Sequence, residues 1–357
     1  MSDAGPTSVR ARRGRTTPLG RRAALGLCAG ALGQVVSGHN APANAAEALA
    51  QTCRILVAGP AGGRLEIWAT LLAAALQPAL PAGTMLQQEL VGGEDGVTGA
   101  NQFATRVPPD GNTLMLAPGD AVLAWLSGDK RAHHGAARWL AVAAGVVPAV
   151  VVARVGLAAG QPLRVGMAGT VGRDLAALLG LELAGFAPTP VFGVLDRTAA
   201  GQALAGGAVD AVLLRGGDLS ADLAALATHG AAPIFALPAA APDGVDRAMP
   251  ELADFIRHLG GAAPAGPLYD AWRGVAAAAQ TEFALVLPAL TAAPLVALWR
   301  QAASQAADLP ELRAAFPGIS VVPAPAAIAL TDAMAPDAAA IAELRAWLAV
   351  RLNWRPA

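Results

Sequence analysis

The stretch RILVAGPAGGRLE, residues 54–66, decides the fold of this chain. A short apolar run follows Arg54, the glycines and proline mark a turn, and an Ala- and Leu-rich amphipathic pattern begins at Leu65. A strand that passes through a glycine-rich turn directly into a helix is typical of βαβ units, whose strands run parallel. The stretch therefore predicts an α/β fold.

The same alternation continues along the chain. Short apolar runs predict strands at residues 54–58, 85–91, 113–117, 149–153, 164–168, 190–194, 211–214 and 233–237. Alanine-rich amphipathic stretches predict helices at residues 65–80, 93–106, 173–184, 199–206, 221–228, 294–307, 309–316 and 337–352. A Pro-, Gly- and Ala-rich stretch, residues 238–267, indicates a surface connection.

The length of 357 residues favours two lobes, because a single hydrophobic core stops growing below that size. We expect residues 46–150 together with 240–357 to form one lobe and residues 151–239 to form the other. Each lobe is expected to be a mainly parallel sheet flanked by helices.

Composition and charge argue against nucleic-acid binding and against a membrane-spanning helix. The net charge is −1, and the arginines after residue 50 are scattered, so the sequence lacks the basic surface that nucleic acid requires. The hydrophobic fraction of 55% is largely alanine. The apolar run at residues 139–153 contains Gly145 and Pro148, and it is shorter than the about 20 residues that cross a bilayer. We therefore expect no transmembrane helix in the mature chain.

The first 45 residues predict export to the periplasm. A basic region with Arg21-Arg22 at its end precedes a modestly apolar stretch, residues 23–36, and the small-residue site Ala43-Asn44-Ala45. This is the layout of a secretory signal peptide, with cleavage expected after Ala45. The paired arginines favour the twin-arginine route over the general one, and a basic tail before a short helix is the alternative.

Cleavage would remove Cys28 and leave Cys53 as the single cysteine, so no disulfide is expected within the mature chain. Cys53 precedes a predicted strand and is expected to be a buried apolar side chain rather than a nucleophile, because unpaired cysteine is among the most buried residue types.

Two glycine-bearing turns predict a site for an anion. One contains Gly62, Gly63, Arg64 and Glu66; the other contains Gly169, Thr170, Val171 and Gly172. Each joins a predicted strand to a predicted helix, so that backbone N–H groups and the positive end of the helix dipole meet there. Ligands of open α/β sheets bind at the carboxyl ends of strands, which places both turns at one cleft. The alternative is that these glycines serve turn geometry alone.

Three further motifs extend this pattern in a fixed order. They are Gly92-Gly93-Glu94-Asp95-Gly96-Val97-Thr98-Gly99, Pro109-Asp110-Gly111-Asn112-Thr113-Leu114, and Ala203-Leu204-Ala205-Gly206-Gly207-Ala208-Val209-Asp210. Together with the two turns, they resemble the extracytoplasmic substrate-binding proteins of tripartite tricarboxylate transporters, called Bug-type receptors. The resemblance covers most of residues 52–320, with strong matching only in the quoted segments.

The resemblance implies a two-lobed periplasmic-binding-protein type II fold that holds a small carboxylate largely through backbone N–H groups. Carried over, the ligand contacts are Gly62, Gly63, Arg64 and Glu66 on one lobe and Gly169, Thr170, Val171 and Gly172 on the other. The chain departs from the family pattern at Val194-Leu195-Asp196-Arg197 and at Leu214-Arg215. Arg215, near a predicted strand end, is either a forked donor for a ligand carboxylate or a solvated loop residue.

No catalytic constellation is recognisable. The sequence has no Gly-x-Ser-x-Gly, Walker, Gly-x-Gly-x-x-Gly or His-Glu-x-x-His motif. Adjacent His133 and His134 are expected at the surface, and the acids Glu94 and Asp95 are interpreted as charges at a helix N-terminus. We therefore expect that the protein binds neither a metal nor a cofactor and that it is not an enzyme.

These features predict a monomeric receptor that takes a small organic acid to a membrane permease or a sensor protein. The first alternative is a protein of the same fold whose pocket has degenerated and which acts as a sensory or scaffold partner. The second is an exported lyase or hydrolase, for which Glu66 is the candidate acid or base.

Overall fold

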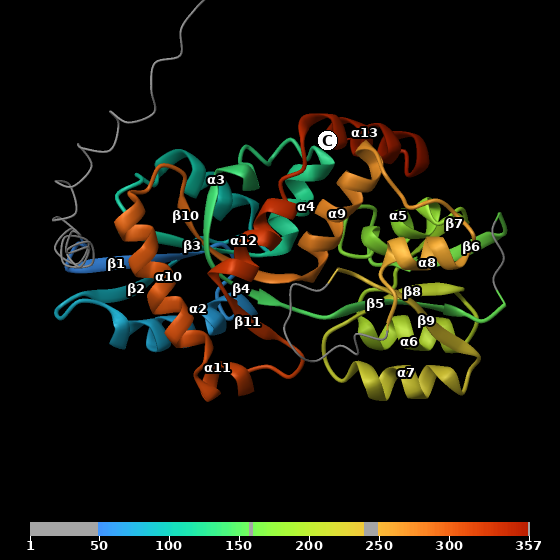
Figure 1. The fold of residues 1–357 in the computed structure, drawn as a ribbon, viewed down its shortest axis with the longest axis horizontal. Helices are drawn as coiled ribbons and strands as arrows, with labels where there is room; N and C mark the ends of the chain where they lie inside the picture. Colours follow the sequence, from blue (N-terminus) through green and yellow to red (C-terminus); the bar gives the residue numbers. More distant parts are fainter. Residues whose placement is uncertain (1–48, 157–159, 239–248, 356–357) are drawn as a thin grey trace, which may run out of the picture. The chain divides into compact units, whose positions relative to one another are not determined.

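The computed structural model describes residues 49–156, 160–238 and 249–355 (Figure 1). The expected signal peptide, residues 1–45, with Cys28 inside it, lies outside the described residues. Within the described ranges, no helix combines the length and apolar character needed to span a membrane.

The first of two sheets contains six strands in the order β11-β4-β10-β3-β1-β2. Parallel pairing joins β1 (Thr52–Val57) to β2 (Met85–Leu90) and to β3 (Thr113–Ala117). Antiparallel pairing joins β10 (Thr281–Pro288) to β3 and to β4 (Trp139–Val146), and β4 to β11 (Ser320–Pro323). The helices that follow or precede these strands are α2 (Arg64–Leu76), η1 (Gln77–Ala79), α3 (Val97–Arg106), α4 (Gly119–Ser127), η2 (Ala136–Arg138), α10 (Ala293–Ala307), α11 (Pro310–Ala314), α12 (Ala324–Ala333) and α13 (Ala338–Arg351).

The second sheet contains five strands in the order β7-β6-β8-β5-β9. Here β6 (Pro162–Met167) runs parallel to β7 (Ala187–Phe192) and to β8 (Ala211–Arg215), whereas β5 (Ala149–Arg154) runs antiparallel to β8 and to β9 (Ala231–Ala236). Its helices are α5 (Leu175–Leu183), α6 (Arg197–Ala205), α7 (Leu219–Ala227) and α8 (Leu252–His258).

Strand β5 reads Ala-Val-Val-Val-Ala because it is covered on both faces. Val151 belongs to the core cluster that contains α5, while Val150 and Val152 belong to the cluster that contains residues of α6 and α7. Alternate residues of one strand therefore face different helix layers. In Figure 1, α5 and α8 lie on one side of the second sheet and α6 and α7 on the other.

Two helix-flanked sheets are present as the sequence predicts, but each sheet is mixed rather than mainly parallel. The reason is that the chain changes sheet twice. Only Val147 and Pro148 separate β4 from β5, and the chain returns to the first sheet through α9 (Pro267–Gln280), which leads directly into β10. β5 and β10 therefore enter their sheets against the direction of their neighbours. The predicted strands and helices correspond to observed elements, while β4, β10, β11, α4, α8, α9 and α12 were not predicted.

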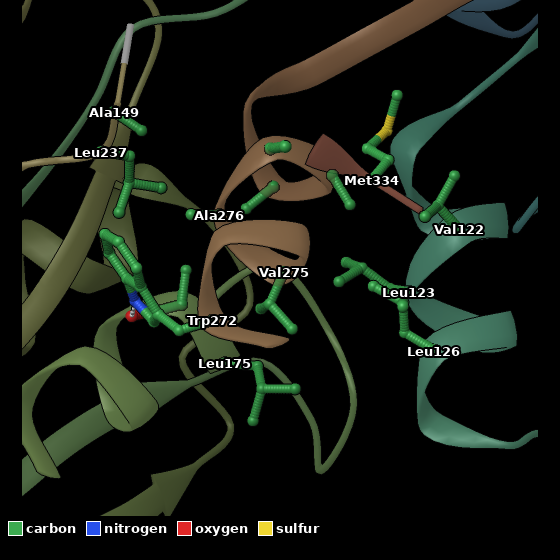
Figure 2. Packing of buried hydrophobic residues seen from close by; sticks show 14 of the residues in the cluster. Val122, Leu123, Leu126, Ala149, Leu175, Leu237, Trp272, Val275, Ala276 and Met334 are labelled. Carbon is green, nitrogen blue, oxygen red and sulfur yellow. Dashed lines mark hydrogen bonds between the residues drawn. The ribbon is translucent and has the colours of Figure 1, made fainter. Parts of the chain in front are cut away.

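Helix α9 carries a core that serves both sheets (Figure 2). Trp272 is 1% exposed, and its indole Nε1 donates a hydrogen bond to the carbonyl of Ala176 in α5 at 2.9 Å. In Figure 2, Trp272 extends from α9 toward Leu237 of the second-sheet side, while Leu123 of α4 lies on the opposite side of the helix. One continuous cluster of buried residues thus links elements of the two sheets.

Replacing Trp272 with Ala is expected to lower the free energy of unfolding by about 3–5 kcal/mol, because the change leaves a large buried cavity. It also leaves the Ala176 carbonyl without its donor. Urea denaturation followed by circular dichroism measures the loss. The exposed neighbour Arg273 provides the control, since its replacement with Ala should change the value by less than about 0.5 kcal/mol. A loss below 1 kcal/mol for Trp272→Ala would contradict the shared core.

Candidate functional site

The turn between β6 and α5 presents unused backbone donors. Among the described residues, none accepts a hydrogen bond from the N–H groups of Gly169, Thr170, Val171 or Gly172. The turn is held in shape by Asp174, whose Oδ2 accepts from the N–H of Ala168 at 2.9 Å. Burial raises the pKa of Asp174, against the opposing effect of this hydrogen bond. The sequence expectation of a turn with free N–H groups thus holds here.

A cavity of about 450 Å³ lies against this turn. Thr170, Val171 and Gly172 form one wall, and the other walls come from α4 and from loops next to the first sheet. The remaining lining residues are Glu94, Asp95, Asp120, Leu123, Ala124, Ser127, Asp129, Arg131 and Trp354. The cavity therefore lies between elements of the two sheets, which is where a two-lobed binding protein needs its ligand site.

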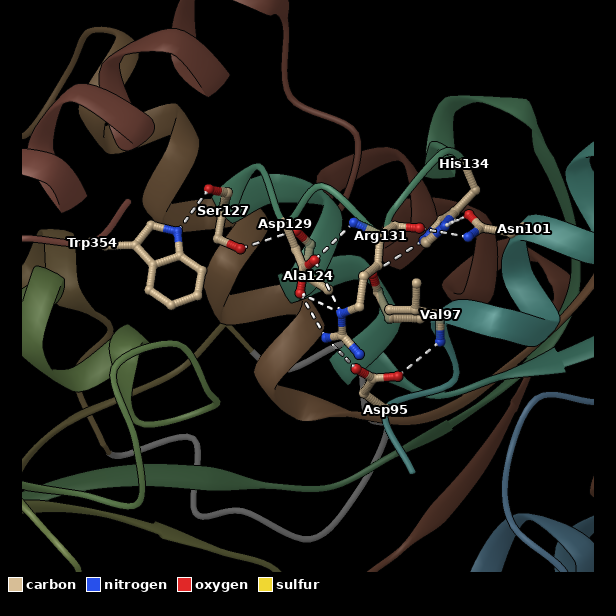
Figure 3. A network of polar contacts seen from close by, with 10 residues as sticks. Asp95, Val97, Asn101, Ala124, Ser127, Asp129, Arg131, His134 and Trp354 are labelled. Carbon is tan, nitrogen blue, oxygen red and sulfur yellow. Dashed lines mark hydrogen bonds and ion pairs between the residues drawn. The ribbon is translucent and has the colours of Figure 1, made fainter. Parts of the chain in front are cut away.

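Arg131 forms a polar wall of this cavity (Figure 3). Its guanidinium group lies 2.7 Å from Asp95 Oδ2 and 2.6 Å from Asp129 Oδ2. Asp95 also accepts from the N–H of Val97, at the start of α3, at 3.2 Å. This contact confirms the interpretation of Asp95 as a charge at a helix N-terminus. Figure 3 also shows Trp354, whose indole donates to the carbonyl of Ser127 at 3.1 Å.

The expectation that both adjacent histidines lie at the surface is wrong for His134. His133 is exposed, but His134 is only 6% exposed. Its ring nitrogens lie 3.1 Å from Asn101 Oδ1 and 3.1 Å from the carbonyl of Ala121. Burial lowers the pKa of His134, so its neutral form is favoured. The ring of Trp139 is stacked with that of His134, with the ring centroids 6.0 Å apart.

The turn between β1 and α2 differs from the other turn because the N–H groups of both of its adjacent glycines, Gly62 and Gly63, are paired within the turn. The N–H of Gly62 donates to Glu66 Oε2 at 2.5 Å, and the N–H of Gly63 donates to the carbonyl of Pro60 at 3.2 Å. A glutamate in the first helical turn that reaches back to a backbone N–H ahead of the helix is a variant of the capping box. Gly62 has φ of +73°, a conformation that favours glycine. Gly62, Gly63 and Glu66 do not line the cavity beside Thr170.

Arg64 and Arg215, both expected at the site, meet at a residue that the sequence analysis missed. Glu282, at the start of β10, is 6% exposed. Arg64 Nε donates to Glu282 Oε1 at 2.6 Å, and Arg215 Nη2 donates to Glu282 Oε2 at 3.1 Å. Arg173 Nη1 lies 3.8 Å from the same Oε2. Three guanidinium groups from elements of both sheets therefore surround one carboxylate.

These charges keep Glu282 ionised. Burial by itself would raise the pKa of Glu282, but the positive charges of Arg215, Arg64 and Arg173 outweigh burial and hold this pKa below its usual value. Burial and the nearby charge of Arg173 lower the pKa of Arg215 to about 10, while Glu282 opposes that shift. Both groups are charged at neutral pH, and Arg215 also donates from Nε to the carbonyl of Ala279 at 2.7 Å.

Arg173 lines a second cavity, of about 330 Å³. Its guanidinium group makes a two-point contact with Asp120 of α4, with Nε–Oδ1 at 2.9 Å and Nη2–Oδ2 at 2.6 Å. Asp120 and Gly172 line both cavities, and Arg215 lines the second. Arg197 also lines the second cavity and pairs with Asp222. The segment that departs from the family pattern is therefore part of this wall.

Of the nine predicted site residues, the structure places Thr170, Val171 and Gly172 on the first cavity and Gly172 and Arg215 on the second. Arg64 joins Arg215 through Glu282.

One feature of the sequence could have indicated Glu282: it is a lone charge at the start of the apolar run TEFALVLP. A strongly buried carboxylate is rare unless it is paired with an opposite charge. No group of three or more His, Cys, Asp or Glu side chains suited to a metal occurs among the described residues. Cys53 is fully buried as expected, and burial raises its pKa to about 11.

The Glu282 cluster makes stability depend on pH. Because the pKa of Glu282 is lower in the folded protein than the ordinary glutamate pKa of about 4.3, its charge stabilises the fold above that pH, and the contribution is lost as pH falls through the folded pKa. Glu282→Gln should lower the free energy of unfolding by about 3 kcal/mol at pH 7, because it leaves partly buried arginines without their carboxylate. The difference from wild type should shrink at pH 3.5.

Urea denaturation at both pH values measures this difference. Glu182→Gln is the matched control, since Glu182 pairs with Arg351 at 2.8 Å but remains 26% exposed, and its loss should cost less than about 1 kcal/mol. An equal deficit of Glu282→Gln at pH 7 and pH 3.5 would show that its charge is not what stabilises the fold.

Comparison with known structures establishes the fold. A TctC solute-binding protein from Polaromonas, solved without ligand, aligns over 85% of this chain and 98% of that chain, with a TM-score of 0.58 and 17% identity. MatC from Rhodopseudomonas palustris, solved with bound malate, covers 83% of this chain and 99% of its own at 22% identity, with a TM-score of 0.47. No family model and no curated protein matches the sequence. On the first of these alignments, the chain has the two-lobed type II fold of a TctC solute-binding protein.

Proposed function

We propose that this protein is an extracytoplasmic receptor of the Bug type, which captures a small carboxylate-bearing molecule and delivers it to a membrane permease or a sensor. It acts in the periplasm as a monomer and is not an enzyme. Residues 1–45 serve as its signal peptide, residues 46–150 with 240–357 form one lobe, and residues 151–239 form the other, to which the start of β5 and helix α8 also contribute.

One observation carries this proposal: the turn at residues 169–172, whose N–H groups have no acceptor among the described residues, contributes Thr170, Val171 and Gly172 to a cavity whose other walls come from α4, from loops next to the first sheet and from Trp354. A carboxylate that accepts from several backbone N–H groups gains charge-assisted hydrogen bonds. The turn also precedes α5, so the positive end of that helix dipole adds to the attraction. A cavity of about 450 Å³ is within the size range of small-molecule sites.

Five of the predicted ligand-binding residues act indirectly in this proposal: Gly62, Gly63, Arg64, Glu66 and Arg215. Since Glu66 and Pro60 accept from the first turn, this turn shapes the cleft, and Arg64 and Arg215 act through Glu282. Gly169, Thr170, Val171 and Gly172 are the direct donors.

These contacts between groups of the protein itself favour a second candidate function. A protein whose anion-binding groups are already paired with its own carboxylates can serve as a scaffold or sensory partner of the same fold with a degenerate pocket. This candidate requires that no small acid binds the cavity and that a protein partner does.

An exported lyase or hydrolase is less well supported. Glu66, the candidate acid or base, accepts a hydrogen bond from Gly62 and does not line the cavity beside Thr170. A general base needs to reach its substrate within hydrogen-bond distance.

The receptor proposal predicts that mono-, di- or tricarboxylates, amides or amino acids include at least one ligand that stabilises the purified protein. At a ligand concentration of 100 times Kd, the expected gain is about 2.7 kcal/mol, because binding to the folded state alone shifts the unfolding equilibrium. A thermal-shift screen followed by calorimetry measures it. If none of these compounds shifts the melting temperature, the scaffold candidate replaces the receptor.

A pair of variants at one position tests the donors of the turn. Val171→Pro removes one N–H group, while Val171→Ala keeps it. Because a hydrogen bond to a charged group contributes about 1.5–3 kcal/mol, Val171→Pro should weaken binding of the ligand found in the screen by about 10- to 100-fold. Val171→Ala should bind nearly as wild type does. Equal affinities of the two variants, measured by calorimetry, would rule out a donor at this position.

Replacing Glu66 with Gln distinguishes receptor from enzyme. The receptor is expected to show no turnover of its ligand before or after the change, whereas an enzyme that uses Glu66 would lose turnover. Product formation is followed by mass spectrometry over hours with the ligand found in the screen. Turnover by wild type that disappears in Glu66→Gln would overturn the receptor proposal.

A further inference from the structure

Glu282 occupies the one point where guanidinium groups from both sheets converge among the described residues. Arg64 begins α2, Arg173 lies in the turn before α5, and Arg215 ends β8. Without Glu282, these three side chains would form a strong receptacle for an anion with more than one carboxylate, since forked guanidinium donors match carboxylate geometry. The protein supplies the carboxylate itself.

Glu282 is held firmly in this position. It lies near the start of β10, at an irregularity in the pairing with β4 between Thr281, opposite Val146, and Phe283, opposite Gly145. Both of its carboxylate oxygens are engaged, Oε1 by Arg64 and Oε2 by Arg215. At 6% exposure it has little room to turn away, and a ligand that displaced it would leave a buried negative charge without partners.

The arginines that line the two cavities are paired as well. Arg131 contacts Asp95 and Asp129, Arg173 contacts Asp120, and Arg197 contacts Asp222. The first cavity is lined by four carboxylates and one guanidinium group; the carboxylates are Glu94, Asp95, Asp120 and Asp129. The local charge around the free N–H groups of the turn is therefore negative, which repels each additional negative charge on a ligand.

We propose that Glu282 is a specificity-determining residue: by pairing with Arg64 and Arg215 beside Arg173, it restricts the cleft to solutes with a single carboxylate, including zwitterions, and rejects di- and tricarboxylates. This inference rests on the proposed receptor function and names its substrate class. One carboxylate binds the N–H groups of residues 169–172. A second carboxylate would find only guanidinium groups that are already paired, and burying it unpaired costs more than it gains.

The test compares wild type with Glu282→Gln, which keeps the shape of the side chain and removes its charge. Propionate, succinate and propane-1,2,3-tricarboxylate form a series with one, two and three carboxylates. Calorimetry at low and at high NaCl concentration measures Kd for each acid. Wild type should bind propionate more tightly than the other two acids.

Glu282→Gln should gain at least 10-fold in affinity for succinate and more for the tricarboxylate, and less than 3-fold for propionate. The gains should shrink at high salt, since they come from unpaired arginines. Glu182→Gln is the matched control, because it also removes a carboxylate from an arginine pair, that of Arg351, but leaves Arg64, Arg173 and Arg215 with their partners. It should bind the series as wild type does.

Wild type that binds succinate or the tricarboxylate as tightly as propionate overturns the inference, and so does a folded Glu282→Gln variant without any gain. If the variant does not fold, the order of affinities in wild type decides alone. If wild type binds none of the acids but Glu282→Gln binds the tricarboxylate, the receptor proposal has failed for these ligands while the blocking role of Glu282 is supported.

Discussion

The burial of the Glu282 carboxylate among three guanidinium groups is the interaction on which the arrangement of the cleft depends. Removing an ionised group from water is costly, and the cost is offset only when opposite charges and hydrogen bonds surround it. Here the partners come from three separate strand-to-helix or strand-to-turn junctions, at Arg64, Arg173 and Arg215. The cluster thus fixes the loops of both sheets relative to one residue of β10, and it uses up positive charge that a ligand would otherwise find.

The two glycine-bearing turns recognised in the sequence differ in whether their backbone N–H groups are paired within the protein. At the turn near Gly62, Glu66 and Pro60 accept from the N–H groups of the two glycines, whereas at the turn near Val171 the N–H groups have no acceptor among the described residues and lie beside a cavity. Glycine-rich turns of similar composition can therefore be either complete in themselves or open to a ligand. An acid accepts from each turn, but Glu66 accepts from a glycine N–H inside the first turn, while Asp174 accepts from Ala168, ahead of the glycines of the second.

Sequence reasoning recovered the strand, turn and helix at residues 54–66 and at 164–184, because these signals are local. It did not recover β10 or Glu282. The run TEFALVLP follows the alanine-rich α9 without a turn residue between them, so nothing in the sequence marks where the helix ends and the strand begins. The role of Glu282 depends on its ion pairs with Arg64, which is 218 positions away in the sequence, and with Arg215, which is 67 positions away. Pairing across such distances has no local signature, and the mixed direction of the sheets was missed for the same reason.

The position of β10 has a consequence for how the chain folds. This strand lies between β3 and β4, so that Ala284 is opposite both Ala117 and Ala144, although the whole second sheet is synthesised between β4 and β10. The centre of the first sheet therefore stays open until nearly four-fifths of the chain has emerged, and its closure needs contacts between remote segments, which are slow to form. Until then the apolar edges of β3 and β4 are exposed to wrong pairing, and a chaperone that shields these edges would assist folding.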